Sequence, residues 1–216
     1  MELGDAIEPD VNLKVRALAE VLQNMAVRGL LEIVPTYRSV LLVYDPMLTE
    51  PRFLMDMVRL AEQRLPGTKL PPHRIVEIPV CYGGEFGPDM EFVAAYHGLS
   101  VEAVIQIHSS QDYQIYMMGF TPGFPFLGGL PEVLATPRLE TPRLLVPAGS
   151  VAIAANQTGI YPIASPGGWR IIGRTPLRLF RPELSEPFLY RAGDIIRFKP
   201  ISAQDFHLLA AQENGN

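Results

Sequence analysis

The segment that decides the fold is TPRLLVPAGSVAIAANQTGIYP (141–162), followed by SPGGWRIIGRTPLRLF (165–180). Apolar runs of three to five residues alternate here with glycine and proline, and one more run follows at 195–198. The same pattern begins earlier in the chain, since residues 119–168 hold eight glycines and eight prolines in 50 positions. Many short strands joined by Gly/Pro turns are typical of a β-barrel or a β-sandwich. The sequence therefore predicts one of these architectures for the second part of the chain.

Between the first third of the chain and this segment, the pattern predicts two strands and two short helices. Residues 74–81 and 113–118 are apolar and are expected to be strands. A helix is predicted over 88–97 and ends at Gly98. Another is predicted over 100–108, with Ser100 as its N-cap.

The first third of the chain predicts a mixture of helices and strands. Helices are expected over 12–29, capped by Asp10 or Asn12 and followed by Gly29, and over 49–65. Strands are expected over 30–34 and 39–44. Residues 66–73 hold three prolines and are predicted to be a linker, and the chain closes in a polar tail, 212–216.

Composition excludes several classes of protein. The net charge is −5 and the pI is near 5.4, so the basic excess typical of a nucleic-acid binder is missing. The single cysteine, Cys81, permits no intramolecular disulfide. The acidic N-terminus does not resemble a signal peptide, and the uncharged stretch 144–169 contains too many Gly, Pro and amide residues for a membrane span. We expect a soluble, cytoplasmic protein.

Arginine is concentrated in the predicted β-rich part. Between Val133 and Arg181 there are six arginines and one acid, Glu140, so that this segment carries +5 and the rest of the chain −10. Arginine binds carboxylate and phosphate through a planar fork, so a small anionic ligand is one interpretation. The other is that these arginines are ordinary surface residues or contact a partner protein. The composition favours this second interpretation.

Two further stretches invite a functional interpretation. Asn156, Gln157 and Thr158, with Tyr161 and Ser165, form a polar cluster that would orient a ligand in a small pocket, although Asn, Thr and Gly also favour a simple β-turn. The loop GFTPGFPFLGG (119–129) alternates glycine with aromatic residues around two prolines. Its rings would pack on a ligand, a partner or the core of the protein, and the core is the commonest outcome.

Histidine and cysteine give weaker signals. His108 ends a predicted helix and is either a general acid/base or phosphate ligand, or a residue favoured there by the helix dipole. The other histidines show no ligand spacing, so no zinc site is predicted. Cys81 is more simply a small buried residue than a nucleophile. Neither a P-loop nor a G-x-S-x-G motif occurs in the sequence.

The motifs resemble those of a known family. GFTPGFPFLGGL (119–130) and the blocks 141–162 and 165–180 are similar to the signature blocks of the KipI/PxpB family, also described as allophanate hydrolase subunit 1 or carboxyltransferase subdomain C/D. VPTYRSVLLVYDP (34–46), VEIPVCYGGEFGPDM (76–90) and LSVEAVIQIHSS (99–110) agree with it. The resemblance covers nearly the whole chain.

The resemblance implies an α+β architecture. It divides the chain into a small N-terminal α/β domain (1–70), a cyclophilin-like β-barrel domain (71–205) and a C-terminal tail (206–216). Family members usually begin with a further strand, of which Met1 to Gly4 resemble the end, so either the N-terminal sheet is expected to lack an edge or the start of the chain is misassigned.

The resemblance also implies a function. Similar family members are the B subunits of an ATP-dependent 5-oxoprolinase, which opens 5-oxoproline to L-glutamate together with subunits A and C (PxpA and PxpC). ATP, with Mg, is the implied cofactor, and the chain alone is expected to be inactive. Two alternatives remain open: an interaction module that inhibits a sensor histidine kinase, and a component of a biotin-dependent urea carboxylase or allophanate hydrolase system.

This chemistry implies roles for particular residues. Phosphorylation of the lactam oxygen needs cations around the phosphoryl group and the substrate carboxylate, and Arg143 and Arg174 are expected to supply them. His108 is a third catalytic candidate. The residues expected to bind substrate are Phe124, Gln157, Thr158, Tyr161, Ser165 and Trp169.

Overall fold

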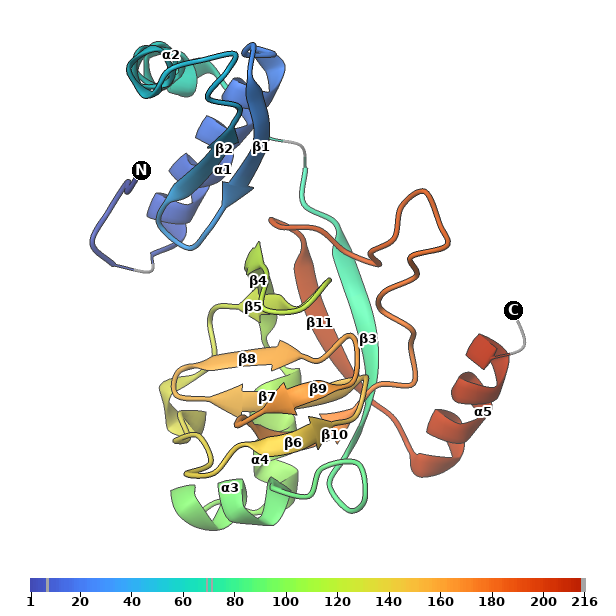
Figure 1. Ribbon diagram of the computed structural model, residues 1–216. Coiled ribbons are helices and arrows are strands. Elements are labelled where there is room, and N and C mark those ends of the chain that lie inside the picture. Colours follow the sequence, from blue (N-terminus) through green and yellow to red (C-terminus); the bar gives the residue numbers. More distant parts are fainter. Residues whose placement is uncertain (7, 69, 71, 215–216) are drawn as a thin grey trace. The chain divides into compact units, whose positions relative to one another are not determined.

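The computed structural model describes residues 1–6, 8–68, 70 and 72–214 (Figure 1). The chain divides into two compact units, Met1–Pro72 and His73–Asn216. This division falls within the proline-rich segment 66–73, two residues after the boundary expected at residue 70. The second unit contains a closed barrel, and the α+β fold class is confirmed.

The N-terminal unit is a layer of two helices packed on a two-stranded antiparallel sheet. Its core joins Leu18 and Leu22 of the first helix to Val40 of the sheet and Val58 of the second helix. The elements are α1 (Pro9–Asn24), β1 (Leu30–Pro35), β2 (Val40–Tyr44), α2 (Pro51–Arg64) and the 3-10 helix η1 (Leu65–Gly67).

Helix α1 differs from its prediction at both ends. It begins at Pro9, whose fixed φ suits the first turn of a helix. Asn12 is therefore not a cap; it is buried, and its Nδ2 donates to the carbonyls of Thr36 and Tyr37 at 3.2 Å each. The helix ends at Asn24, and Gly29 instead enters β1 with a φ of +82°.

The first residues of the chain pair with the start of β2. Met1 and Val40 exchange two hydrogen bonds of 2.9 Å, and the Leu3 N–H donates to the Arg38 carbonyl at 2.8 Å. Beside the rest of β2 lies a groove of about 590 Å³ between the strand and α2, lined mainly by apolar residues such as Leu42 and Met55.

The second unit is built on a seven-stranded closed barrel with the order β10-β3-β11-β4-β5-β8-β7. β3 and β11 are parallel, and every other pair in it is antiparallel. A separate two-stranded sheet joins β6 to β9. The strands are β3 (Ile75–Tyr82), β4 (Asp112–Met118), β5 (Pro125–Leu127), β6 (Arg143–Val146), β7 (Ser150–Ala154), β8 (Gln157–Ile160), β9 (Ser165–Gly167), β10 (Arg170–Arg174) and β11 (Ile195–Pro200).

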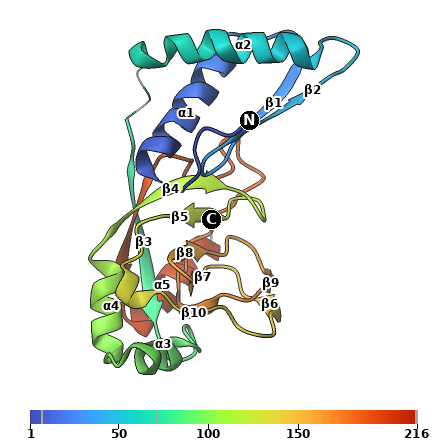
Figure 2. The same ribbon diagram turned by 90° about the vertical axis from the view of Figure 1, so that its left-hand side faces the viewer.

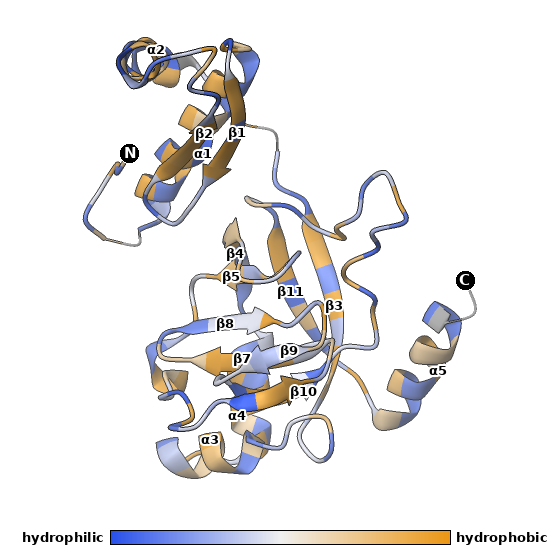
Figure 3. Ribbon diagram, viewed as in Figure 1, coloured by the Kyte–Doolittle hydropathy of each residue, from blue (hydrophilic) through white to orange (hydrophobic). Residues whose placement is uncertain are grey.

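Strand alternation gives the barrel an apolar layer on each side of its wall. Val151 and Ile153 of β7 belong to the interior core, whereas Ala152 and Ala154 belong to a second cluster outside the wall. Because β7 is buried on both faces, it is apolar at nearly every position. Figure 3 shows similar hydrophobic stretches along β3 and β10. The outer cluster includes Val146 of β6, so the β6–β9 sheet covers this face.

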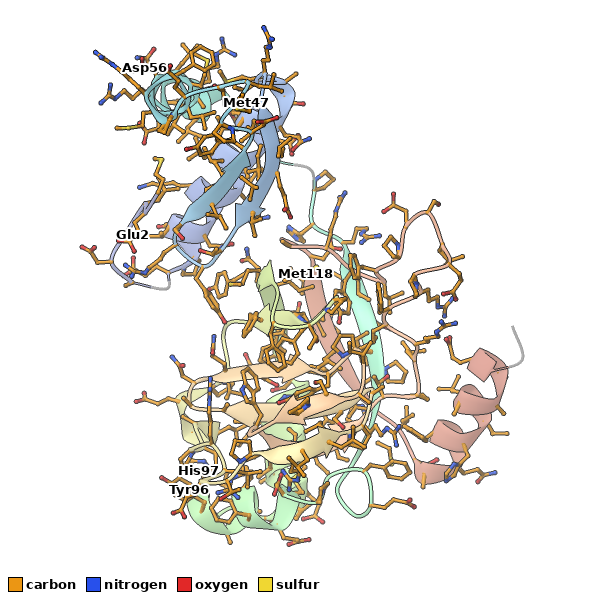
Figure 4. The ribbon with its side chains drawn as sticks, viewed as in Figure 1. Glu2, Met47, Asp56, Tyr96, His97 and Met118 are labelled. Carbon is orange, nitrogen blue, oxygen red and sulfur yellow. The ribbon has the colours of Figure 1, made fainter. Side chains whose placement is uncertain are left out.

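Two short helices, α3 (Met90–His97) and α4 (Val101–Ser109), lie beside each other at one end of the barrel (Figure 2). Gly98 ends α3 in the left-handed conformation, and the Ser100 Oγ accepts the Ala103 N–H at 3.1 Å. Both predicted boundary residues are thus confirmed. Figure 4 labels Tyr96 and His97 at the end of α3. A short 3-10 helix, η2, spans Glu132–Leu134.

The predicted tail, 206–216, is not a tail over its described part. Helix α5 spans Ala203–Asn214, and its Phe206 is buried against Cys81 and Phe86. Glu213 Oε2 also accepts from the Arg181 guanidinium at 2.5 Å. Residues 215 and 216 lie outside the described part. None of the described helices is long and apolar enough to cross a membrane.

Candidate functional site

A pocket of about 410 Å³ opens on the outer face of the barrel. Its walls come from the loop after β4, from β5, from the segment before β6 and from β9 with the turn that follows. Aromatic rings dominate the lining, and one cation, Arg138, faces it. The residues are Phe120, Phe124, Phe126, Arg138, Pro142, Tyr161, Pro166, Gly167, Gly168 and Trp169. An apolar pocket with a few polar groups is typical of a small-molecule site.

Two glycines allow the aromatic floor of the pocket to form. A Cβ at Gly159 of β8 would lie 2.9 Å from Phe124 Cζ and 3.1 Å from Trp169 Cζ3. A Cβ at Gly167 of β9 would collide with the Tyr161 phenol oxygen. The rings then meet edge to face, with centroids 5.2 Å apart for Phe124 and Tyr161 and 5.5 Å for Phe124 and Trp169. Each of these two glycines thus makes room for a ring of the floor.

The phenol of Tyr161 is the neutral polar group of this floor. Burial raises the pKa of Tyr161 above its ordinary value, and the backbone N–H of Trp169 and the charges of Arg138 and Arg143 offset part of that rise in pKa. The phenol therefore keeps its proton near neutral pH. The Arg138 guanidinium lies 5.8 Å from the Trp169 ring centroid. Among the described residues, Arg138 makes no ion pair, so its charge is open to an anionic ligand.

Arg143 is held by a partly buried ion pair. Its Nη2 donates to Asp89 Oδ1 at 2.9 Å, and Asp89 Oδ2 accepts the Ile171 N–H at 2.7 Å. The other terminal nitrogen, Nη1, is buried and has no partner among the described residues. Such a donor calls for a water molecule or a ligand. The Ser165 Oγ on the adjacent strand is likewise buried and has no hydrogen-bond partner among the described residues.

Phe120 forms one wall of the pocket in a strained conformation. Its φ is +66°, and 65% of its surface is exposed. Its ring lies edge-on to Phe124 and Tyr161, and its other side borders a second hollow of about 400 Å³. That hollow begins at Met118, labelled in Figure 4 at the end of β4. A left-handed φ at a bulky residue is often found at ligand sites.

His108 lies inside the barrel and not at the pocket. It is completely buried, and its ring stacks on Phe198 with centroids 4.6 Å apart. Its Nδ1 lies 2.8 Å from the Tyr82 hydroxyl, and its Nε2 lies 2.9 Å from Thr158 Oγ1. Because Thr158 donates to the Ala152 carbonyl, the histidine must carry its proton on Nε2. Burial lowers the pKa of His108 to about 3, which keeps the ring neutral.

This position corrects two expectations. Neither ring nitrogen of His108 is open to a substrate, because both are occupied within the core. Thr158 is predicted to contact the ligand, but its side chain points into the barrel, where it holds His108. Alternation along β8 explains this, since Gly159 takes the outward position on the side of the pocket floor.

Gln157 and Arg174 do not line the pocket. Gln157 begins β8 opposite Ala154, next to the exposed hairpin turn, and is half-buried. Arg174 ends β10, and its Nε donates to the Ala148 carbonyl at 2.8 Å. Phe124, Tyr161 and Trp169 are therefore the predicted substrate residues that meet at the pocket, with Arg143 and Ser165 close by on β6 and β9.

The six arginines do not form one cationic face. Arg178 pairs with Glu183, and Arg181 pairs with Glu213 of α5. Arg170 lies over the Phe92 ring, 3.7 Å from its centroid. Arg138 is the one that lines the pocket. Because acids outside the pocket neutralise several of the others, a net charge counted along residues 133–181 overstates the local field.

Sequence reasoning missed Phe126, Arg138 and Asp89 as contributors. Phe126 and Arg138 stand in stretches already singled out, the aromatic loop and the arginine-rich segment, but nothing separates them from their neighbours. Asp89 gives no signal, because its partners, Arg143 and Ile171, are more than fifty positions away. Among the described residues, no cluster of three or more His, Cys, Asp or Glu side chains is placed to hold a metal ion.

Comparison with known sequences gives a consistent picture. The family model described as "Carboxyltransferase domain, subdomain C and D" matches residues 1–190. The B subunit of the 5-oxoprolinase of Bacillus subtilis (strain 168) is 45% identical over 225 residues, which cover 99% of this chain and 93% of that protein. The corresponding 5-oxoprolinase protein of Escherichia coli O157:H7 is 58% identical over 130 residues, 60% of each chain.

Solved structures share the fold. TTHA0988 aligns with a TM-score of 0.83 at 39% identity, over 94% of this chain but only 39% of its own length. PH0987 from Pyrococcus horikoshii aligns with a TM-score of 0.60 at 48% identity, over 95% of this chain and 94% of its own. The same fold thus occurs both as nearly a whole chain and as part of a longer polypeptide.

Proposed function

The chain belongs to the family of carboxyltransferase domains, subdomains C and D, and we propose that it is the B subunit of an ATP-dependent 5-oxoprolinase. It would act in the cytoplasm with subunits A and C (PxpA and PxpC) and open 5-oxoproline to L-glutamate. The observation that carries this proposal is the near-full-length similarity to the B subunit of a 5-oxoprolinase. The inhibition of a histidine kinase stays a prediction from the resemblance, and no feature of the fold favours it over the enzyme.

The pocket on the outer face of the barrel is the proposed substrate site. The five-membered lactam ring would lie against Phe124 and Trp169, with the Tyr161 phenol as a hydrogen-bond donor. The carboxylate would approach Arg138, whose charge has no acidic partner among the described residues. The free Arg143 Nη1 and the Ser165 hydroxyl offer two more donors beside the pocket. Together these groups suit a small, flat anion.

The chemistry needs activation because an amide carbonyl is a poor electrophile. The lactam oxygen would attack the γ-phosphorus of ATP and release ADP. Water would then add to the activated carbon, and the C–N bond would break as the nitrogen takes up a proton, which leaves γ-glutamyl phosphate. A second water would hydrolyse this acyl phosphate to L-glutamate and phosphate. Negative charge builds up around the phosphoryl group, and arginines that are already positioned stabilise it. Arg143 is proposed for this role. Arg174 could share it only if the partner proteins bring the nucleotide to the end of β10 that lies beside Ala148.

A reconstitution assay tests the proposal. The chain would be incubated with ATP, Mg and 5-oxoproline, first alone and then with PxpA and PxpC from the same genome, while glutamate and phosphate are measured. We expect no turnover by the chain alone and 5-oxoproline-dependent ATP hydrolysis by the complete set. Turnover by the chain alone would contradict its role as one component of a complex. An assembled complex without turnover would contradict the oxoprolinase proposal.

A further inference from the structure

A line of hydrogen-bonding side chains crosses the interior of the barrel. It joins the Tyr82 hydroxyl at the end of β3 to His108 at 2.8 Å, and His108 to Thr158 Oγ1 of β8 at 2.9 Å. The Thr158 hydroxyl then donates to the Ala152 carbonyl of β7 at 3.1 Å. His108 and Thr158 are completely buried, and β3 and β8 are not neighbours in the barrel. The proposed function gives these buried groups no role.

Thr158 stands directly before the residue on which the pocket floor rests. That residue, Gly159, pairs with Phe126, which lines the pocket. The rings of Phe124 and Trp169 rest against the Gly159 backbone, because a Cβ there would lie 2.9 Å from the first and 3.1 Å from the second. Protein interiors are close-packed, so even a small shift of β8 would displace these rings. The position of β8 therefore decides the shape of the floor.

We propose that Thr158 is a positioning residue of the substrate pocket, and that its bonds to His108 and Ala152 hold β8 where the aromatic floor needs it. This rests on the proposed function for the identity of the substrate. Thr158 does not touch the ligand, because its side chain points into the barrel, and it acts through the backbone of Gly159. A precise binding site needs such supporting groups behind the residues that contact the ligand.

Thr158→Val is the test variant, because it keeps the shape of the side chain and removes only the hydroxyl. The His108 N–H then loses its acceptor, so we expect β8 to shift. The floor holds the lactam ring equally in the ground state and the transition state, so the KM for 5-oxoproline should rise about tenfold with kcat unchanged. Thr158→Ser keeps the hydroxyl and should bring KM to within about twofold of wild type.

A loss of stability alone gives a different kinetic result. It lowers the folded fraction, and with it the apparent kcat, but leaves KM unchanged. Ile196→Ala is the matched control, because Ile196 of β11 is completely buried in the interior core and does not line the pocket. Steady-state kinetics of the complex with PxpA and PxpC at saturating ATP measures both constants. A Thr158→Val variant that changes only kcat, or neither constant, would overturn the proposal.

The indole N–H resonance of Trp169, the single tryptophan, reports on the floor directly. In NMR spectra of the chain alone, we expect it to shift in Thr158→Val but not in Thr158→Ser or Ile196→Ala. An unchanged resonance in Thr158→Val would also overturn the proposal. If that variant does not fold, Tyr82→Phe takes its place with the same expected results, since it frees the other side of His108. A wild-type complex without turnover would reject the proposed function alone, because the resonance still decides whether Thr158 positions the floor.

Discussion

Arg138 and Tyr161 differ in how the fold holds them. Tyr161 is fixed within the aromatic cluster, and its phenol accepts the Trp169 N–H, so its position does not depend on a ligand. Arg138 is exposed and rests on the Trp169 ring, and no acid neutralises it within the described part of the chain. A substrate carboxylate would therefore gain a charged hydrogen bond from Arg138 at little cost to the core.

Arg138→Ala is expected to raise the KM for 5-oxoproline about 10- to 100-fold, since a hydrogen bond to a charged group contributes about 1.5–3 kcal/mol. Initial rates of the reconstituted complex would measure it. The free energy of unfolding should stay within about 0.5 kcal/mol of wild type, because the side chain is exposed. Arg59→Ala, at an exposed arginine of α2, is the control. An unchanged KM in the Arg138 variant would remove the residue from the site.

His108 makes the stability of the barrel depend on pH. The pKa of His108 is about 3 in the folded protein against about 6.5 when unfolded, so between these values only the unfolded chain binds the proton. Stability should therefore fall as the pH drops below 6.5, by up to about 1.4 kcal/mol per pH unit from this group. Urea unfolding followed by Trp169 fluorescence at pH 7, 6, 5 and 4 would measure this fall in the free energy of unfolding. His108→Gln lacks the titrating ring, so an equal pH slope in that variant would refute the assignment.

At the scale of elements, the loop between β4 and β5 contains a strained backbone conformation at Phe120, whose ring forms a wall of the pocket. Phe120 has a φ of +66°, where a side chain costs roughly 1–2 kcal/mol. In Phe120→Gly the free energy of unfolding should stay the same or rise by about 1 kcal/mol, because glycine tolerates this conformation. It should also weaken substrate binding, because a wall of the pocket is lost.

The matched control is Ala155→Gly, in the exposed turn between β7 and β8, where φ is +48°. It should be stabilised in the same way without any change in KM. Urea unfolding and steady-state kinetics together measure both effects. If Phe120→Gly binds substrate as well as wild type does, the ring is no part of the site.

At the scale of the whole molecule, the two units have separate cores. All the residues of the interior and outer clusters of the barrel come from His73 onward, and those of the N-terminal core come from before Pro72. The barrel in a chain reduced to residues 73–216 is therefore expected to have a free energy of unfolding within about 1 kcal/mol of its value in the full chain. Urea unfolding followed by Trp169 fluorescence would measure both values. A loss of several kcal/mol would show that the first unit stabilises the second.

The sequence by itself determined that the second part consists of short strands between Gly/Pro turns, as in a barrel or a sandwich, and it located two short helices with the residues that bound them. Glycine and proline act locally, so their spacing between apolar runs fixes where strands end, and Ser100 and Gly98 bound their helices through bonds to neighbouring residues. Phe124, Tyr161 and Trp169 stand in the glycine-rich blocks that carry the family resemblance, but the sequence did not predict that their rings form one cluster.

Only the tertiary structure decided which side chains reach the pocket. The direction of a strand residue depends on pairing with distant segments, and this register sends Thr158 inward to His108 while Gly159 faces the pocket floor. Charge was decided in the same way, because Glu213 neutralises Arg181 across 32 positions while Arg138 meets no acid in the described chain. A local pattern cannot report contacts that exist only once the barrel has closed.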